Sequence, residues 1–472
     1  MIEDQLAFTP ATQLGELIAT KAISPVELVD LYLSRIQRLD GRLNSYITVD
    51  SDGALRAARE AEAAVQRGDA LGPLHGIPVS VKDLELTRGL TTTGGSLVFK
   101  DRVPEQDSLV VERLRKAGAI ILGKTNTPEF GLSGTTENRL GDACRNPWDP
   151  NRTSGGSSGG AAAAVAAGLC ALATGTDGGG SIRIPASFCG VYGLKPTQGR
   201  VPRYPAAVPA VANQLSQPGP ISRTVADAAL LLGVLAGHDS RDPASLRSAP
   251  DDYAAATGSG VRGLRVAWSP DYGYAAVDPE VVRVCNYASE RFRDLGCSLE
   301  QAELKLDDPF PAFFALFSTS SYAGFGQLLS SDGERLTDYA RYTLDYAATV
   351  TGVDYARALG YVDRLQSQFD ELFERFDLLL SPTMAVPAFP IEQRPTSIAG
   401  RAVEPFWGFL PFTYPINMIG HPAASIPCGL SAEGLPIGLH IVGRRADEPS
   451  VLAASAAFEQ LGVWSNPRPA VS

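Results

Sequence analysis

The sequence predicts an α/β fold, in which short buried strands alternate with amphipathic helices. Short apolar segments at residues 77–81 and 119–122 have the length of strands, and residues 109–116 between them repeat apolar side chains at helical spacing. This alternation is typical of a sheet covered by helices. Further strand-like segments occur at residues 378–380, 424–427 and 437–442.

Helical patterns dominate two other parts of the chain. Residues 1–70 form a helical N-terminal portion, because Ser24 ahead of Pro25 is a helix start and residues 26–39 and 54–66 are amphipathic. Residues 300–375 are rich in aromatic and helical patterns and are interpreted as a helical insertion over the core. The length of 472 residues leaves one or two domains open.

Composition and charge restrict the class of partner. The chain has 52 acidic and 41 basic residues and a formal net charge of −11, with no basic patch, so neither nucleic acid nor an anionic membrane surface is expected as a partner. The longest apolar-looking stretch, residues 161–176, is too short to cross a bilayer. The acidic N-terminus does not resemble a secretory signal, which predicts a cytoplasmic protein.

Cysteine spacing argues against both a metal site and a disulfide framework. The six cysteines are scattered along the chain without CxxC spacing, and we expect them to be reduced and mostly buried.

The segment most informative about chemistry is residues 151–199, which contains two clusters of glycine and serine. The second cluster ends in Gly178, Gly179, Gly180 and Ser181. Glycines at this density let the backbone approach a ligand and direct several N–H groups to one place, as an oxyanion requires. A flexible loop has the same composition, but well-patterned apolar segments adjoin both clusters and favour loops held by a core.

A nucleophilic serine needs a proton acceptor. None of the four histidines lies in either cluster, so a desolvated, neutral lysine is the other candidate. Lys82 follows an apolar strand in GIPVSVKDL, where such burial is expected.

Three blocks, at residues 75–84, 153–168 and 173–197, closely resemble the successive motifs of the amidase signature family. Lys82 and Ser157 lie 75 residues apart, and Ser157 and Ser181 lie 24 apart, as in that family. Further similarity at residues 145–153, 221–237, 422–430 and 435–444 extends the resemblance over most of the chain, except residues 300–375. It implies one domain over residues 1–472, with a central mixed β-sheet flanked on both sides by α-helices.

The resemblance also implies the roles of individual residues. Ser181 would be the nucleophile, and Ser157, after a cis peptide bond, would relay its proton to Lys82. Gly178 stands where many members have a bulkier residue. The oxyanion hole and substrate side would be formed by Gly178, Gly179, Gly180 and Gly131, and the triad would be supported by Ser158, Asp177 and Arg183.

The implied activity is hydrolysis of a small-molecule amide through an acyl-enzyme, without cofactor or metal and with a homodimer as one expected state. Trp407 and the aromatic segment 409–417 suggest an apolar pocket, which favours hydrophobic or aryl amides. A glutamine-hydrolysing subunit of a tRNA-dependent amidotransferase is the alternative within the family. It is disfavoured because the nearest acid before Thr413 is Glu404, and ester or carbamate hydrolysis stays open.

Two readings outside the family are weaker. Residues 155–159 fit the G-x-S-x-G elbow of α/β-hydrolases, but the residues before them form turns and not a strand. A dinucleotide-binding loop fails because Arg183 stands where the last glycine of that motif belongs.

Overall fold

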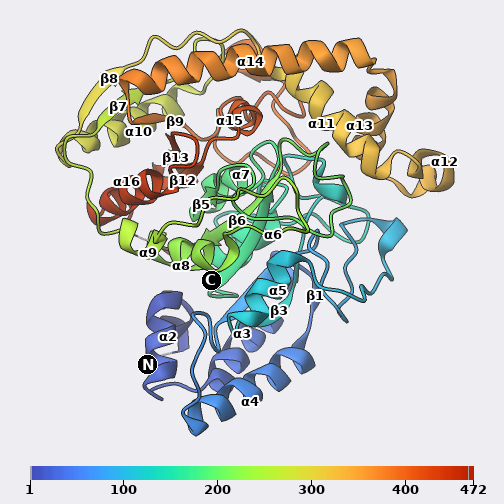
Figure 1. Ribbon diagram of the computed structural model, residues 1–472, viewed down its shortest axis with the longest axis vertical. Helices are drawn as coiled ribbons and strands as arrows, with labels where there is room; N and C mark the ends of the chain where they lie inside the picture. The colour runs from blue at the N-terminus through green and yellow to red at the C-terminus, as the bar shows by residue number, and fades with distance from the viewer. Residues whose placement is uncertain (1–2, 466) are drawn as a thin grey trace.

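A computed structural model describes residues 3–465 and 467–472 of the chain (Figure 1). Its strands are β1 Tyr46–Val49, β2 Pro78–Lys82, β3 Ile120–Thr125, β4 Leu172–Asp177, β5 Tyr192–Lys195, β6 Gln217–Ser222, β7 Arg265–Trp268, β8 Ser298–Gln301, β9 Leu378–Pro382, β10 Ser397–Ile398, β11 Arg401–Ala402, β12 Ala423–Leu430 and β13 Pro436–Gly443.

Its helices are α1 Glu3–Ala7, α2 Ala11–Ala19, α3 Pro25–Leu39, α4 Ser51–Arg67, α5 Leu109–Lys116, α6 Gly159–Ala166, α7 Arg183–Cys189, α8 Val225–Leu235, α9 Tyr253–Ala256, α10 Pro279–Glu290, α11 Phe310–Phe325, α12 Leu328–Asp332, α13 Asp338–Thr349, α14 Gly352–Arg375, α15 Tyr414–Ile419 and α16 Glu448–Gln460.

Eleven strands form one mixed sheet in the order β1-β3-β2-β4-β6-β5-β12-β13-β9-β7-β8. The β2 strand is parallel to both β3 and β4, whereas β6, β5, β12, β13 and β9 pair antiparallel in succession. The hairpin of β12 and β13 therefore lies between β5 and β9. The predicted α/β fold with a central mixed sheet is confirmed.

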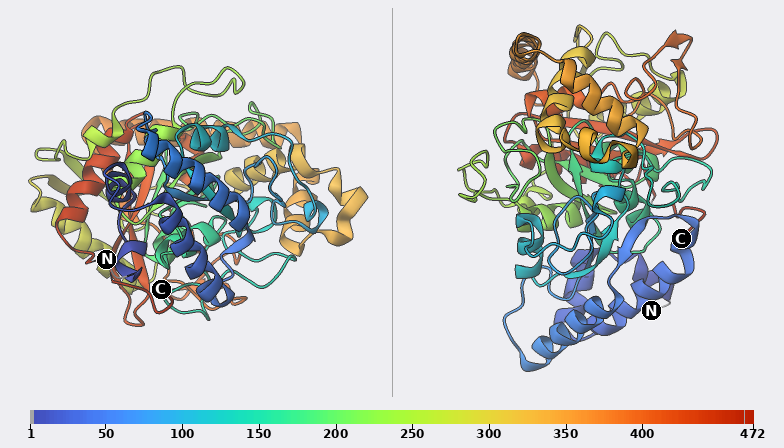
Figure 2. Two further views of the ribbon diagram at one scale, coloured as in Figure 1. Left: turned by 90° about the horizontal axis from the view of Figure 1, so that it is seen from below. Right: turned by 90° about the vertical axis from the view of Figure 1, so that its right-hand side faces the viewer.

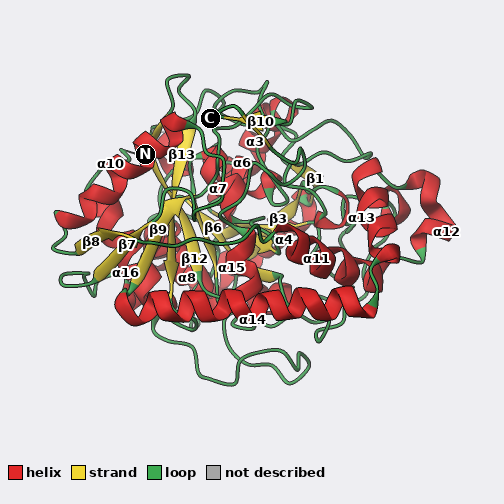
Figure 3. Cartoon of the chain, turned by 90° about the horizontal axis from the view of Figure 1, so that it is seen from above, coloured by secondary structure: helices red, strands yellow, loops and turns green. Residues whose placement is uncertain are grey.

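Helices cover both faces of this sheet (Figure 3). Consecutive residues of a strand point to opposite faces. In β5, the Tyr192 hydroxyl donates to Ser455 on α16, while a side chain at Gly193 would meet Ala186 on α7. The α16 helix therefore covers one face and α7 the other.

The two ends of the molecule are helical (Figures 1 and 2). At one end, α3 packs against β2 and α4 against β3, while α2 packs against α8. The α3 helix begins at the predicted cap, because Ser24 Oγ accepts from Val26 N at 2.9 Å and Glu27 accepts from Ser24 N at 3.0 Å. At the other end, α11 to α14 occupy residues 310–375.

All six cysteines are free and buried, as expected from their spacing. No helix among the described residues is long and apolar enough to cross a membrane.

Candidate active site

Lys82 and the two glycine–serine clusters lie where the carboxyl ends of two neighbouring interior strands, β2 and β4, meet one edge of the sheet. The β2 strand ends at Lys82, and its parallel neighbour β4 ends at Asp177. Carboxyl ends of adjacent parallel strands lie at the same edge, where ligands commonly bind in open α/β sheets. The loop before α6 brings Ser157 to this edge, and the loop after β4 brings Ser181 there. The Gly156–Ser157 peptide bond is cis.

The Lys82 ammonium group is fully buried among hydroxyl groups. Its Nζ lies 2.7 Å from Ser157 Oγ, 2.9 Å from Ser158 Oγ and 3.0 Å from Thr176 Oγ1. No carboxylate of the described residues lies within ion-pair distance of it. These contacts place a short proton path between Lys82 and Ser157.

Burial lowers the pKa of Lys82 to about 7, because the charged amine loses its hydration. That value includes two opposing effects of nearby charges: Asp177 and Glu85 raise the pKa, and Arg203 lowers it. Near neutral pH a substantial fraction of Lys82 is therefore unprotonated and able to accept a proton.

The glycine loop before Ser181 is held by the carboxylate of Asp177. Asp177 accepts from Gly180 N at 2.8 Å and from Ile182 N at 3.2 Å, and it forms a buried ion pair with Arg183 at 2.9 Å. Burial alone would raise the pKa of Asp177, but the charge and hydrogen bonds of Arg183 hold it well below its usual range.

The amide of Gly180 is consequently not free to bind an oxyanion, which corrects the expectation from the sequence. Among the described residues, none accepts a hydrogen bond from the amides of Gly178, Gly179 or Ser181, so these three remain as donors. Gly131 lies close by: a Cβ on it would come 3.2 Å from Ser157 Oγ. Its own N–H donates to Pro128 O at 2.9 Å.

Two residues behind the loop were not found from the sequence as site residues. Thr413 Oγ1 donates to Gly179 O at 2.6 Å. Asn417 Nδ2 donates to both the backbone oxygen and Oδ1 of Asp177, each at 2.9 Å. They lie at the start of and within α15, some 230 residues beyond the glycine loop, and fix its position.

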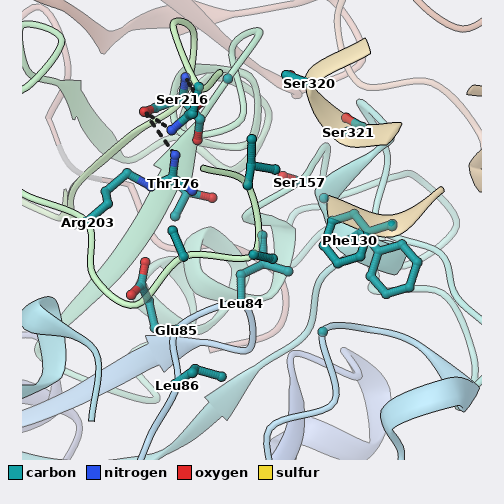
Figure 4. Close-up of a pocket in the computed structure, with 18 of the residues that line it drawn as sticks. Leu84, Glu85, Leu86, Phe130, Ser157, Thr176, Arg203, Ser216, Ser320 and Ser321 are labelled. Atoms are coloured by element: carbon teal, nitrogen blue, oxygen red, sulfur yellow. Dashed lines mark hydrogen bonds between the residues drawn. The ribbon is translucent and has the colours of Figure 1, made fainter. Parts of the chain in front are cut away.

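A cavity of about 310 Å³ opens beside Ser157 and Ser181 (Figure 4). Its aromatic lining comes from Phe99, Phe130, Phe317, Phe325 and Tyr204. The ring of Phe130 stacks on that of Phe325 with centroids 4.1 Å apart. The α11 helix thus contributes to the wall. The remaining lining includes Gly131, Gly178, Thr176, Glu85, Arg102, Arg203, Asn213 and Ser216.

The expectation that Trp407 and residues 409–417 form the pocket wall is wrong. None of the described residues between 404 and 417 lines this cavity. Trp407 instead packs behind the loop, where a side chain at Gly179 would meet its ring and that of Phe313. None of the four histidines lines the cavity either, so it contains no serine–histidine pair.

The family model described as Amidase matches residues 27–452. The chain belongs to the amidase family. This amidase is 39% identical to a protein named Acylamidase from Rhodococcus erythropolis, over 100% of this chain and 99% of the relative. It is also 39% identical to a component of the glutamyl-tRNA(Gln) amidotransferase from Moorella thermoacetica, over 98% of this chain and 99% of that one.

Among solved structures, this amidase is similar to a bacterial aryl acylamidase of the amidase signature family. The TM-score is 0.92 at 34% identity, and the match covers 98% of this chain and 99% of the other. A peptide amidase from Stenotrophomonas maltophilia matches with a TM-score of 0.81 at 28% identity, over 96% of each chain. These findings confirm the family and the activity class predicted from the sequence, hydrolysis of a carboxylic amide.

Proposed function

We propose that this amidase hydrolyses hydrophobic amides, aryl amides among them, through an acyl-enzyme on Ser181. The observation that carries the proposal is the contact between Lys82 Nζ and Ser157 Oγ, 2.7 Å apart, with no carboxylate of the described residues in ion-pair contact with the buried amine. A neutral amine there is a base for the hydroxyl of Ser157, and Ser157 is the relay between Lys82 and Ser181.

In this mechanism Ser181 Oγ attacks the amide carbonyl and transfers its proton to Ser157 Oγ, which passes its own proton to Lys82. The relay of Lys82 and Ser157 then returns a proton to the departing amine, which leaves the acyl group on Ser181. Water then attacks the ester with the same groups acting as base, which releases the acid. The amides of Gly178, Gly179 and Ser181 are the proposed donors to the oxyanion.

The proposed substrate class is supported by the aromatic wall. Phe99, Phe130, Phe317 and Phe325 offer ring faces and edges to an apolar or aryl group. Hydrolysis of free glutamine would need an acid to hold its ammonium group. Glu404 does not line the cavity and accepts from Trp407 N at 2.6 Å, so it is unsuited to that role. Glu85 does line the cavity, but its carboxylate already accepts from Ser108 Oγ at 2.7 Å.

We also propose a cytoplasmic location, which six buried free thiols support because thiols stay reduced there. The partner is then a small-molecule amide. A homodimer stays an expectation from the family resemblance, and size-exclusion chromatography with light scattering tests it.

The first experiment is release of the aniline from a panel of anilides, beside glutamine and short aliphatic amides and esters. Ser181→Ala is expected to reduce anilide turnover by at least about ten-thousandfold. Ser320→Ala is the matched control: it also lines the cavity, but its hydroxyl donates to Phe317 O at 3.0 Å, so its loss leaves the reacting groups in place. Anilide turnover that survives in Ser181→Ala refutes the mechanism, and turnover of glutamine alone refutes the substrate class.

A further inference from the structure

Phe130 and Arg203 lie on different sides of the reacting serines in this cavity, and both sides mix polar and apolar residues. Figure 4 shows Phe130 on one side of Ser157 and the side chains of Arg203 and Glu85 on the other. Asn213 and Ser216 lie beside Arg203, because Asn213 Nδ2 and Arg203 Nη1 both donate to Ser216 O. The neighbouring Tyr204 also lines the cavity. A substrate whose carbonyl lies at Ser157 and Ser181 can therefore place one part against phenylalanine rings and the other near the Arg203 guanidinium group.

The guanidinium group of Arg203 has few partners in the protein. Within the part of the chain that the structure describes, its one hydrogen bond is a long contact from Nη1 to Ser216 O at 3.5 Å. No carboxylate of those residues forms an ion pair with it. Glu85 faces the same cavity, but its carboxylate accepts from Ser108 Oγ at 2.7 Å. Most of the five N–H donors of Arg203 are therefore directed to no acceptor among the described residues.

Another arginine beside the site shows the contrast. Arg183 donates to Asp177, to Thr413 O at 3.1 Å and to Asn417 Oδ1 at 2.6 Å, and its Nη1 lies 3.0 Å from His440. The guanidinium group of Arg183 is thus bonded to other groups of the protein, whereas most N–H donors of Arg203 have no such partner and face the cavity.

The backbone holds Arg203 in place although its side chain is underbonded. Its N–H donates to Asp242 Oδ2 at 2.8 Å, and the next residue, Tyr204, accepts from Leu109 N at 2.8 Å through its carbonyl. Burial also lowers the pKa of Arg203, while the charges of Glu85 and Asp242 oppose that shift. A partly desolvated cation with no carboxylate in direct ion-pair contact is unfavourable, and a bound anion would offset that cost.

We propose that Arg203 is a binding residue for an anionic group of the substrate. The substrate is then an amide with an apolar or aryl part on one side of the scissile carbonyl and a carboxylate on the other. This inference rests on the proposed function, because it places the substrate carbonyl at Ser181, and it narrows the substrate class from hydrophobic amides to amphipathic, acidic ones.

The test measures binding separately from turnover. Two matched pairs of amides are titrated calorimetrically into Ser181→Ala: glutaryl and pentanoyl para-nitroanilide, with the carboxylate on the acyl side, and phenylacetyl-β-alanine and N-propyl phenylacetamide, with it on the amine side. In at least one pair the carboxylate compound is expected to bind about ten- to a hundredfold more tightly. Adding Arg203→Gln is expected to abolish that ratio, and Arg203→Lys to retain part of it because the charge remains.

Arg88→Gln is the control for loss of one positive charge. Arg88 is exposed, lies three residues beyond Glu85 and does not line the cavity, so its variant is expected to keep the ratio. The proposal is overturned if neither pair favours the carboxylate, if the ratio persists in Arg203→Gln, or if Arg102→Gln and not Arg203→Gln removes it. Turnover of the same compounds by the wild-type enzyme tests the proposed function independently of these affinities.

Discussion

The low pKa of Lys82 predicts how the pH profile responds to a new charge. Thr176 Oγ1 lies 3.0 Å from Lys82 Nζ, so Thr176→Asp places a carboxylate against the amine. At that distance and an effective dielectric constant of about 20, Coulomb's law gives about 5 kcal/mol of attraction, or about four pKa units. Burial of the new carboxylate reduces this, and we expect the pKa of Lys82 to rise by at least about two units.

The sign of the effect on activity follows from the role of Lys82 as a base. In the wild type, kcat/KM for an anilide is expected to rise with pH through about 7, as Lys82 loses its proton. In Thr176→Asp the rising limb moves to about pH 9 or above, which lowers kcat/KM at pH 7 by about fiftyfold or more.

The assay is kcat/KM from about pH 5.5 to about pH 10.5, with thermal unfolding checked at each end. Thr176→Asn is the matched control, since it has nearly the same size as aspartate and no charge. A Thr176→Asp limb that stays near pH 7, or an equal shift in Thr176→Asn, would refute the assignment of Lys82 as the base.

Two further predictions concern residues that hold the site. Asn417→Ala removes two hydrogen bonds to Asp177 behind the glycine loop. We expect kcat to fall about ten- to a hundredfold, with KM changed little, because the loop is then less well positioned. A raised KM at unchanged kcat in steady-state kinetics would contradict this positioning role. The buried carboxylate of Glu129 accepts from Thr337 N at 2.6 Å and from Thr337 Oγ1 at 2.7 Å at the start of α13. Glu129→Gln replaces it with a neutral amide and so weakens these hydrogen bonds. Its free energy of unfolding in urea is expected to fall by about 1–3 kcal/mol, whereas the exposed Glu334→Gln should match the wild type.

Local patterns predicted much of the fold because several strands and helices are long or strongly apolar. Residues 77–81 and 437–442 correspond closely to β2 and β13, and the cap at Ser24 starts α3. Two of the strands that were missed have weak local signals. Tyr192–Lys195 has only four residues, and Gln217–Ser222 contains two prolines and a glycine, yet both are buried between neighbouring strands. Tertiary pairing overrides local preference there.

The site residues also fall into two groups, those that the sequence predicted and those that only the structure shows. Lys82, Ser157 and Ser181 were found because motif blocks surround them, and the structure brings Lys82 and Ser157 into contact. The hydrogen bond from Gly180 N to Asp177 Oδ1 depends on the geometry of a turn, which no local sequence pattern predicts. Arg203 also carries no motif, because its lack of partners becomes visible only in three dimensions.

The position of the hairpin formed by β12 and β13 has a consequence for synthesis of the chain. As residues leave the ribosome, β1 to β6 and then β7 to β9 emerge as two sets of strands that have no direct pairing with each other. Residues 423–443 fill the gap between β5 and β9 and join the two sets. Until residues 423–443 are in place, β5 and β9 each have an unpaired edge. The nascent chain therefore has two edges on which strands of other chains can pair. A nascent chain that stalls before residue 423 is therefore a target for chaperones or for aggregation, even with every triad residue already synthesised.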